Sequence, residues 1–183
     1  MDTVRTIPES RIVMLSGEIT DEVATEVCEQ LLKLDAEANG ESITLMINSP
    51  GGSVRAGWMI CDTIKHIGNA ETICIGLCAS MAALVLMSGY FRSILPHGRV
   101  MLHQPLAGTG LVQASDFEIT ARELARSRDE LYSYICSCTG KSLSQVTEDC
   151  DRDHWLDASE AVAYGIVDEI VSPENRAYPA GNI

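Results

Sequence analysis

The sequence predicts a single α/β domain built from repeated strand–helix units. Short apolar runs alternate with longer segments in which apolar residues recur at helical spacing, and glycine or proline stands at most of the changes between them. This alternation is typical of a sheet covered by helices. With 183 residues, 46% of them hydrophobic, the chain can bury one sizeable core. It shows no internal repeat, low-complexity tract or linker, so we expect residues 1–183 to form one domain.

The first half of the chain predicts two strand–helix units. Residues 1–10 are polar, contain Pro8 and predict a flexible arm. In the first helix, apolar residues recur at helical spacing, acidic residues occupy the first turn, and Gly40 follows the end. The second strand is apolar enough to be buried on both faces. The predicted strands cover 11–15 and 42–47, and the predicted helices cover 22–36 and 54–67.

The second half predicts four more strands and four more helices. A short strand ends at Gly76, after which Ser80 begins an apolar helix that reaches Gly89. Ser115 and Glu118 form a capping-box motif that opens a long helix with one apolar stripe. From the residues alone, that helix packs either on another subunit or on its own core. The strands cover 72–75, 90–95, 99–102 and 166–171; the later helices cover 115–138, 142–150 and 157–165; 151–156 predicts a charged loop and 173–183 a loose tail.

The charge of the chain excludes two classes of partner. Thirteen Lys and Arg residues against 26 Asp and Glu residues give a formal net charge of −13. A nucleic-acid-binding protein would need a basic patch, and an anionic membrane surface would repel this chain.

The N-terminus lacks the apolar core of a secretory signal, and the apolar run 79–87 is too short to span a bilayer. We therefore expect a cytoplasmic protein.

The cysteine and histidine residues favour neither a disulfide framework nor a metal site. The seven cysteines are an odd number scattered through predicted helices and strands, which is typical of free thiols in a reducing compartment. The close pair Cys136 and Cys138 lacks a second pair at zinc-ligand spacing, and the four histidines have no ligand spacing between them. We expect no metal and no cofactor in this chain.

Three places in the sequence could carry chemistry, and each also has a structural explanation. Ser80 is placed to cap a helix, or to act as a nucleophile beside the backbone N–H groups of the first turn. The loop Gly51–Gly52 is either a turn or a bare-backbone oxyanion hole, and it lacks the phosphate-binding glycine motifs. His103 at a strand end is either structural or part of an active site.

Four motifs in register decide between these alternatives. They are Ile-Asn-Ser-Pro-Gly-Gly (47–52), Gly-x-x-Ala-Ser-Met (76–81), Arg-Val-Met-Leu-His-Gln-Pro (99–105), and Asp-Arg-Asp (151–153) followed by Ala-x-Glu-Ala-x-x-Tyr-Gly-Ile-Val-Asp (158–168). In order and spacing they resemble the signatures of the ClpP family, the proteolytic subunits of the ATP-dependent caseinolytic (Clp) serine proteases. The resemblance runs from about Arg11 to Val171.

The resemblance implies a role for each candidate residue. Ser80 corresponds to the nucleophile, His103 to the general base, and Asp153 to the acid that orients the imidazole. The backbone N–H groups of Gly52 and Met81 correspond to the oxyanion hole. Gly51 corresponds to a residue that supports the shape of this loop.

The resemblance also implies a fold, an assembly and partners. It implies a crotonase-like α/β fold of repeated β-β-α units, with residues 106–138 as a protruding handle. Two heptameric rings would stack into a tetradecamer for protein quality control, and Arg152 would lie at the ring–ring contact. A hexameric AAA+ ATPase of the Clp type would consume ATP and deliver substrate. The positions that often carry aromatic docking residues are atypical here: Thr44, Met46 and His66.

Two alternatives to an active peptidase follow from the same residues. The chain could be a weakly active or regulatory ring subunit that needs a second ClpP-type subunit, as the altered docking positions suggest. It could also be a crotonase-type acyl-CoA enzyme with the same fold and oxyanion hole. The latter chemistry needs no Ser-His-Asp trio, so the four motifs favour the peptidase.

Overall fold

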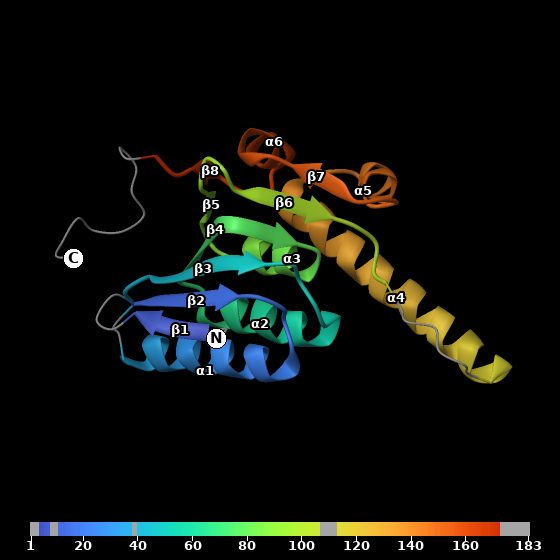
Figure 1. Cartoon of the computed structure of the whole chain (residues 1–183), viewed down its shortest axis with the longest axis horizontal. Coiled ribbons are helices and arrows are strands. Elements are labelled where there is room, and N and C mark those ends of the chain that lie inside the picture. The colour runs from blue at the N-terminus through green and yellow to red at the C-terminus, as the bar shows by residue number, and fades with distance from the viewer. Residues whose placement is uncertain (1–3, 8–10, 38–39, 107–112, 173–183) are drawn as a thin grey trace.

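The computed structural model describes residues 4–7, 11–37, 40–106 and 113–172. They form one eight-stranded sheet with helices against it (Figure 1). The strands are β1 (Val4–Ile7), β2 (Ile12–Ser16), β3 (Ile43–Ser49), β4 (Ala70–Ala79), β5 (Arg92–Ile94), β6 (Arg99–Leu102), β7 (His154–Leu156) and β8 (Glu169–Ile170). The helices are α1 (Asp21–Glu37), α2 (Val54–Ile67), α3 (Met81–Met87), α4 (Ala114–Thr139), α5 (Leu143–Asp149) and α6 (Ala158–Tyr164).

The long strand β4 divides the sheet into two parts. Along the main path the order is β1-β2-β3-β4-β5-β8, parallel from β2 onward, while β1 runs antiparallel to β2. The second part of β4, Leu77–Ala79, pairs with β6, and β7 lies antiparallel on the far side of β6. The C-terminal ends of β4 and β6 therefore lie side by side, and β7 lies next to β6.

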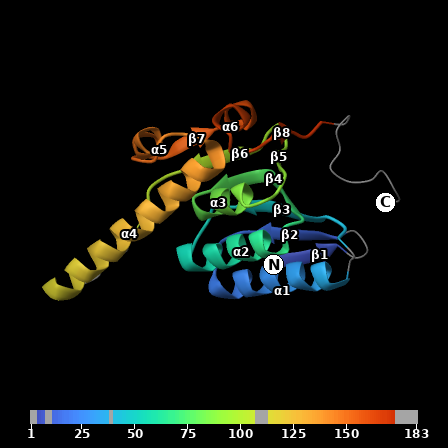
Figure 2. The same ribbon diagram turned by 180° about the vertical axis from the view of Figure 1, so that it is seen from behind.

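Side-chain alternation along the strands creates a large core on one face of the sheet and a small cluster on the other. The large core joins residues such as Val13 and Leu45 of the strands to Val27 and Ile60 of α1 and α2, and α3 is wholly buried in it. Figures 1 and 2 show α1, α2 and α3 on this face. The cluster on the opposite face consists of Ile12, Met46, Ile73 and Val171, with Met14, Ile75 and Leu95 packed against it.

Helix α4 packs on this body only near its C-terminal end. Leu131, Tyr132 and Ile135 are buried, whereas Phe117 and Ile119 are 52% and 57% exposed. In Figures 1 and 2 the N-terminal part of the helix extends away from the sheet. The C-terminal part of its apolar stripe therefore packs in the core of this chain, whereas the apolar residues of the N-terminal part do not, and the expected role of the helix as a handle stays a prediction.

The strand predicted to end at Gly76 in fact continues to Ala79. Two contacts keep the backbone extended: β6 pairs with the continuation, and the side-chain oxygen of Asn48 accepts a hydrogen bond from the amide of Leu77 at 3.0 Å. A Cβ atom at Gly76 would lie 2.6 Å from that same oxygen, so glycine allows this close approach rather than ending the strand. The sharp turn comes instead at Ser80.

Several other element boundaries differ from prediction. Val4–Ile7, part of the expected flexible arm, pair with β2, and residues 154–156 of the predicted loop form β7 against β6. Helix α4 begins at Ala114 after Gln113, so Ser115 lies inside the helix and is not its cap. The last strand, expected over 166–171, is only Glu169–Ile170. For Val4–Ile7 and residues 154–156, pairing across the sheet overrides local propensity. The expected tail 173–183 and most of the loop before α4 lie outside the described residues.

Candidate active site

Ser80 occupies a strained turn between β4 and α3. Its φ of 53° and ψ of −126° are unusual for a residue with a side chain, and such strain costs about 1–3 kcal/mol and gathers at functional sites. Its amide is fixed by the carbonyl of Met101 at 2.8 Å. The hydroxyl makes no capping hydrogen bond to the helix, so the interpretation of Ser80 as an ordinary cap is wrong. The geometry resembles the strand-to-helix elbow that exposes a nucleophilic serine.

His103 directly follows β6 and faces Ser80. Ala79 pairs with Met101 in the parallel β4–β6 ladder, so the C-terminal ends of the two strands lie at the same edge of the sheet. Ser80, after β4, and His103, after β6, are therefore placed at this edge. Nε2 of His103 lies 2.7 Å from Oγ of Ser80, an ordinary hydrogen-bond distance. A neutral imidazole with its proton on Nδ1 can accept the hydroxyl proton at Nε2, which is the relationship of base to nucleophile.

Asp153 lies on the other side of the imidazole, just before β7. Its Oδ1 is 3.4 Å from Nδ1 of His103, longer than an ordinary hydrogen bond. The Asp153 side chain is 60% exposed, whereas that of His103 is 16% exposed. The three side chains predicted from the motifs are thus gathered in the order Ser, His, Asp. The distance from Asp153 to His103 is longer than that from Ser80 to His103.

The Gly51–Gly52 loop is held between Ile19 and the Ser80 turn. The amide of Ile19 donates to the carbonyl of Gly51 at 2.8 Å, and the carbonyl of Ile19 accepts from the amide of Ser53 at 2.9 Å. On the other side, a Cβ atom at Gly51 would lie 2.9 Å from Cβ of Ser80 and 3.0 Å from the amide nitrogen of Met81. The loop therefore touches the candidate nucleophile directly.

These contacts set the direction of the Gly52 amide. In a planar trans peptide the C=O and N–H groups point opposite ways, and the C=O of Gly51 points at Ile19. The N–H of Gly52 must therefore point away from Ile19. The amide of Met81 opens the first turn of α3, where amides lack a carbonyl partner within the helix. The two amides named by the resemblance both lie beside Ser80, where they could donate to an oxyanion.

Sequence reasoning missed two residues that shape this loop. Ile19, wholly buried, makes the backbone bridge described above. Ser49, also wholly buried, accepts a hydrogen bond at Oγ from the amide of Gly51 at 3.1 Å. For Ser49 the available signal was its place in the motif beside the glycines. For Ile19 there was none, because the contact is made by backbone atoms of a distant segment.

The cysteines near the site are poor nucleophiles. Cys78, two residues before Ser80, is wholly buried, and this burial raises the pKa of its thiol well above the ordinary value. Burial likewise raises the pKa of Cys150, ahead of the Asp153 loop, to about 12. Both therefore remain neutral thiols at physiological pH. Ser80 is the nucleophile that the geometry favours.

Arg152 precedes Asp153 in the chain and is exposed to solvent. Its side chain is 92% exposed, and its Nε lies 3.7 Å from a carboxylate oxygen of Asp151. The guanidinium therefore makes one weak ion pair with its neighbour in the chain. The position leaves it accessible to another subunit, and its expected role in a ring–ring contact remains a prediction.

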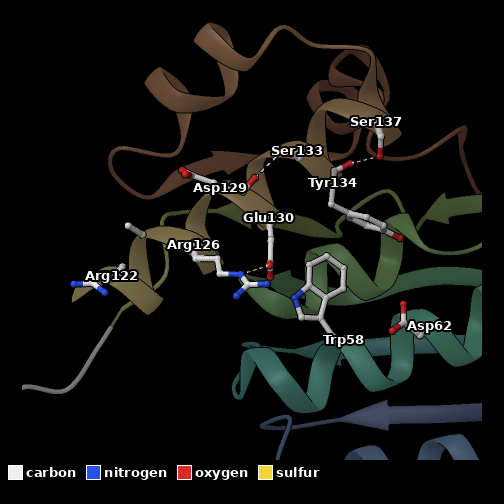
Figure 3. Close-up of a pocket in the computed structure, with 10 residues that line it drawn as sticks. Trp58, Asp62, Arg122, Arg126, Asp129, Glu130, Ser133, Tyr134 and Ser137 are labelled. Atoms are coloured by element: carbon white, nitrogen blue, oxygen red, sulfur yellow. Dashed lines mark hydrogen bonds and ion pairs between the residues drawn. The ribbon is translucent and has the colours of Figure 1, made fainter. Parts of the chain in front are cut away.

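A groove of about 1010 Å³ lies between α2 and α4, apart from these residues (Figure 3). Trp58 and Asp62 line it from α2, and charged residues line it from α4, where Arg126 pairs with Glu130 at 3.2 Å. Its serine hydroxyls are occupied, because Ser133 and Ser137 each donate to a backbone carbonyl of α4 at 2.7 Å. The groove holds none of the predicted site residues.

Within the described part of the chain, no three His, Cys, Asp or Glu side chains gather as metal ligands would. No helix formed by these residues is both long and apolar enough to cross a membrane.

Comparison with known proteins agrees with the motifs and the fold. The family model described as Clp protease matches residues 1–174. The chain is 46% identical to an ATP-dependent Clp protease proteolytic subunit of Porphyromonas gingivalis over 179 residues, covering 96% of this chain and 80% of the relative. It is 45% identical to proteolytic subunit 3 of Synechococcus sp. (strain CC9902) and 46% identical to proteolytic subunit 2 of Prochlorococcus marinus (strain MIT 9313). Each of these matches spans 170 residues, or 91% of this chain and 85% of the relative. The α/β sheet with its parallel strands is consistent with the ClpP-type fold, and the chain belongs to the Clp protease family.

Proposed function

We propose that this chain is the serine endopeptidase subunit of a compartmentalised Clp-type protease that hydrolyses peptide bonds of unfolded polypeptides. The observation that carries the proposal is the 2.7 Å contact between Oγ of Ser80 and Nε2 of His103 at a strained strand-to-helix turn. Membership of the Clp protease family and the names of the relatives support the same reaction.

The proposed reaction divides hydrolysis into two acyl transfers. Ser80 Oγ attacks the peptide carbonyl while Nε2 of His103 takes its proton, and the amides of Gly52 and Met81 donate to the oxyanion. His103 then gives the proton to the leaving amine, which leaves an acyl ester on Ser80. Water, deprotonated by the same imidazole, attacks the ester carbon; the imidazole then gives this proton to Oγ of Ser80 as the ester bond breaks and the carboxylic acid product leaves. Asp153 orients the imidazole and stabilises its charged form. No cofactor takes part in this chain.

We further propose that the chain assembles into two stacked heptameric rings, with α4 at the contact between rings. The exposed apolar residues Phe117 and Ile119 on the projecting part of α4 support an interface there. A Clp-type AAA+ ATPase would deliver unfolded substrate, and the protein would act in the cytoplasm. The docking positions remain atypical, because none of Thr44, Met46 and His66 is one of the aromatic residues often found there; Thr44 and Met46 are buried in the sheet, and His66 is exposed.

A serine-directed probe tests this function. A fluorophosphonate should label the purified protein, and a short peptide amide should be hydrolysed. Ser80→Ala should abolish both, whereas Ser159→Ala, which removes an exposed hydroxyl from α6, should change neither. Labelling or hydrolysis that survives Ser80→Ala would remove Ser80 from the mechanism.

A second candidate function is a weakly active ring subunit that needs a different ClpP-type subunit. Two observations favour it: the Asp153–His103 contact is long at 3.4 Å, and several relatives are named as numbered subunits 2 or 3. Peptidase activity of the pure protein distinguishes the two functions. Full activity from a ring of this chain alone excludes the second, whereas activity that appears only on mixing with another subunit supports it.

A further inference from the structure

One residue connects the strand that carries His103 to the loop that carries Asp153. Gln104 immediately follows His103 at the end of β6. Its amide donates to the carbonyl of Cys150 at 2.9 Å, and its side-chain Nε2 donates to the carbonyl of Asp151 at 3.0 Å. The two hydrogen bonds bind Gln104 to adjacent residues, Cys150 and Asp151, in the segment just before Asp153.

That segment needs an anchor if Asp153 is to stay near the imidazole. Cys150 is buried at the end of α5, but residues 151–153 are exposed and reach the next strand only at His154. The Asp153–His103 contact is already 3.4 Å long. A further shift of the loop by about 1 Å would remove the contact, and misplacement on this scale reduces catalytic rates strongly.

We propose that Gln104 is a positioning residue that holds the 150–153 loop so that Asp153 stays against Nδ1 of His103. The inference rests on the proposed function, since it concerns the acid of the proposed trio. Any residue except proline at position 104 could donate the main-chain hydrogen bond to Cys150. The hydrogen bond to Asp151, in contrast, requires a side chain that carries a donor and is long enough to reach its carbonyl. Glutamine meets both needs in the residue next to the base.

Gln104→Met tests the side-chain bond, because methionine keeps a similar volume and removes the donor. The matched control is Gln145→Met, which removes a 2.9 Å hydrogen bond from Gln145 to Asp149 within α5 and leaves the Asp153 loop untouched. Both variants are assayed as assembled protein on a short peptide amide, and kcat is expressed per Ser80 titrated to completion by a fluorophosphonate. This normalisation removes any loss that comes only from unfolded protein.

We expect Gln104→Met to lower kcat per titrated site roughly 2- to 10-fold, the range of one net hydrogen bond, with KM unchanged. Gln145→Met should match the wild type. In an Asp153→Ala background, Gln104→Met should have no further effect, because the residue it positions is gone. Gln104→Glu, which keeps the length of the side chain but cannot donate, should reproduce the loss and serves if the methionine variant folds poorly.

An unchanged kcat per site in both Gln104 variants would overturn the inference. The same fractional loss with and without Asp153 would also overturn it, because Gln104 would then act through another group. Failure of the proposed function looks different: the wild type would be inert, or labelling would survive Ser80→Ala. In that case the inference falls with the function on which it rests.

Discussion

The carbonyl oxygen of Gly51 accepts a hydrogen bond from the amide of Ile19 at 2.8 Å, and this bond turns the next amide, that of Gly52, away from Ile19. The oxyanion-hole geometry of the proposed mechanism therefore depends on a contact between two segments far apart in the chain. It also depends on glycine, because Gly51 has a φ of 93° and lies against Ala79 and Ser80. Both dependences can be tested by substitution.

Gly51→Ala should abolish activity beyond what backbone strain explains. The new methyl group would lie 2.7 Å from the carbonyl oxygen of Ala79 and 2.9 Å from Cβ of Ser80, so the loop must move away from the nucleophile. Loss of one oxyanion donor typically lowers kcat by about 100- to 1000-fold. Peptide hydrolysis by the assembled protein measures this loss.

Gly68→Ala is the control for strain alone. Gly68, at the end of α2, also has a positive φ of 72°, but nothing lies within 4 Å of a Cβ atom there. Gly68→Ala should lower stability by about 1–2 kcal/mol, measured by denaturant unfolding, because of the left-handed backbone, and Gly51→Ala should lower it by at least as much, because its methyl group also collides with Ala79 and Ser80. Only Gly51→Ala should lose the activity. Equal activities in the two variants would show that the position of the 51–52 loop does not matter for the reaction.

Ser49→Ala should weaken catalysis and stability together. Oγ of the wholly buried Ser49 is the acceptor for the Gly51 amide at 3.1 Å, and its removal leaves a buried N–H without that partner. We expect a loss of about 1–3 kcal/mol in the free energy of unfolding and a several-fold fall in kcat, because the loop loses one of its supports.

Ser142→Ala provides the comparison for Ser49→Ala. Ser142 caps α5 by accepting from the amide of Gln145 at 3.2 Å, so its loss should cost about 1 kcal/mol of stability and leave kcat unchanged. Unfolding curves and peptide hydrolysis of both variants separate the two effects. A normal kcat in Ser49→Ala would mean that Ile19 alone holds the loop.

Local pattern predicted most of the fold because most elements carry their own signals. Helix α2 begins and ends where its residues predicted, with Ser53 as cap and Gly68 at its end, and α6 lies within the predicted range 157–165 and begins with a capping box of Asp157 and Glu160. Predictions failed where a partner strand decided the structure. The continuation of β4 past Gly76 and the strand β7 both depend on pairing with β6, which is far away in sequence.

The site was predictable only as far as motifs mark it. Ser80, His103 and Asp153 lie in motifs, and the structure gathers them. The strained φ of Ser80 could not be predicted, because it results from the clamp between the Gly51 loop and the carbonyl of Met101. The support from Ile19 could not be predicted either, since backbone hydrogen bonds do not require a particular side chain at the residues that form them.

The Arg92–Asp168 pair should make stability depend on pH in the acid range. Burial alone would raise the pKa of Asp168, but hydrogen bonds from the side chain and amide of Arg92, and its positive charge, outweigh burial and hold that pKa below the ordinary 3.8. A carboxyl with a lowered pKa in the folded state stabilises the fold above its unfolded pKa. This stabilisation is lost as the pH falls below about 3.8 and through the folded pKa.

Asp168→Asn should therefore lower the free energy of unfolding at pH 7 by about 1–3 kcal/mol and flatten its fall toward acid pH. Asp62→Asn, at an exposed carboxylate of α2, should leave the pH dependence as it is in the wild type. Urea unfolding between pH 3 and pH 7 measures both. An Asp168→Asn curve parallel to that of the wild type would show that this pair does not carry the acid sensitivity.

Arg152→Ala should separate the rings of the proposed assembly if its exposed guanidinium lies at their contact. The side chain is 92% exposed and makes one 3.7 Å contact with Asp151, so its removal should hardly change the stability of the subunit itself. In the double ring, the same arginine would occur once in each subunit, so the effect of the substitution on assembly would be multiplied by the number of contacts.

We expect sedimentation to show single rings at protein concentrations where the wild type forms double rings, with a parallel fall in peptidase activity. Arg55→Ala, which removes an exposed cation from α2, should leave the double ring intact. Double rings of Arg152→Ala with wild-type activity would place the ring contact elsewhere and leave the projecting part of α4 as its main element.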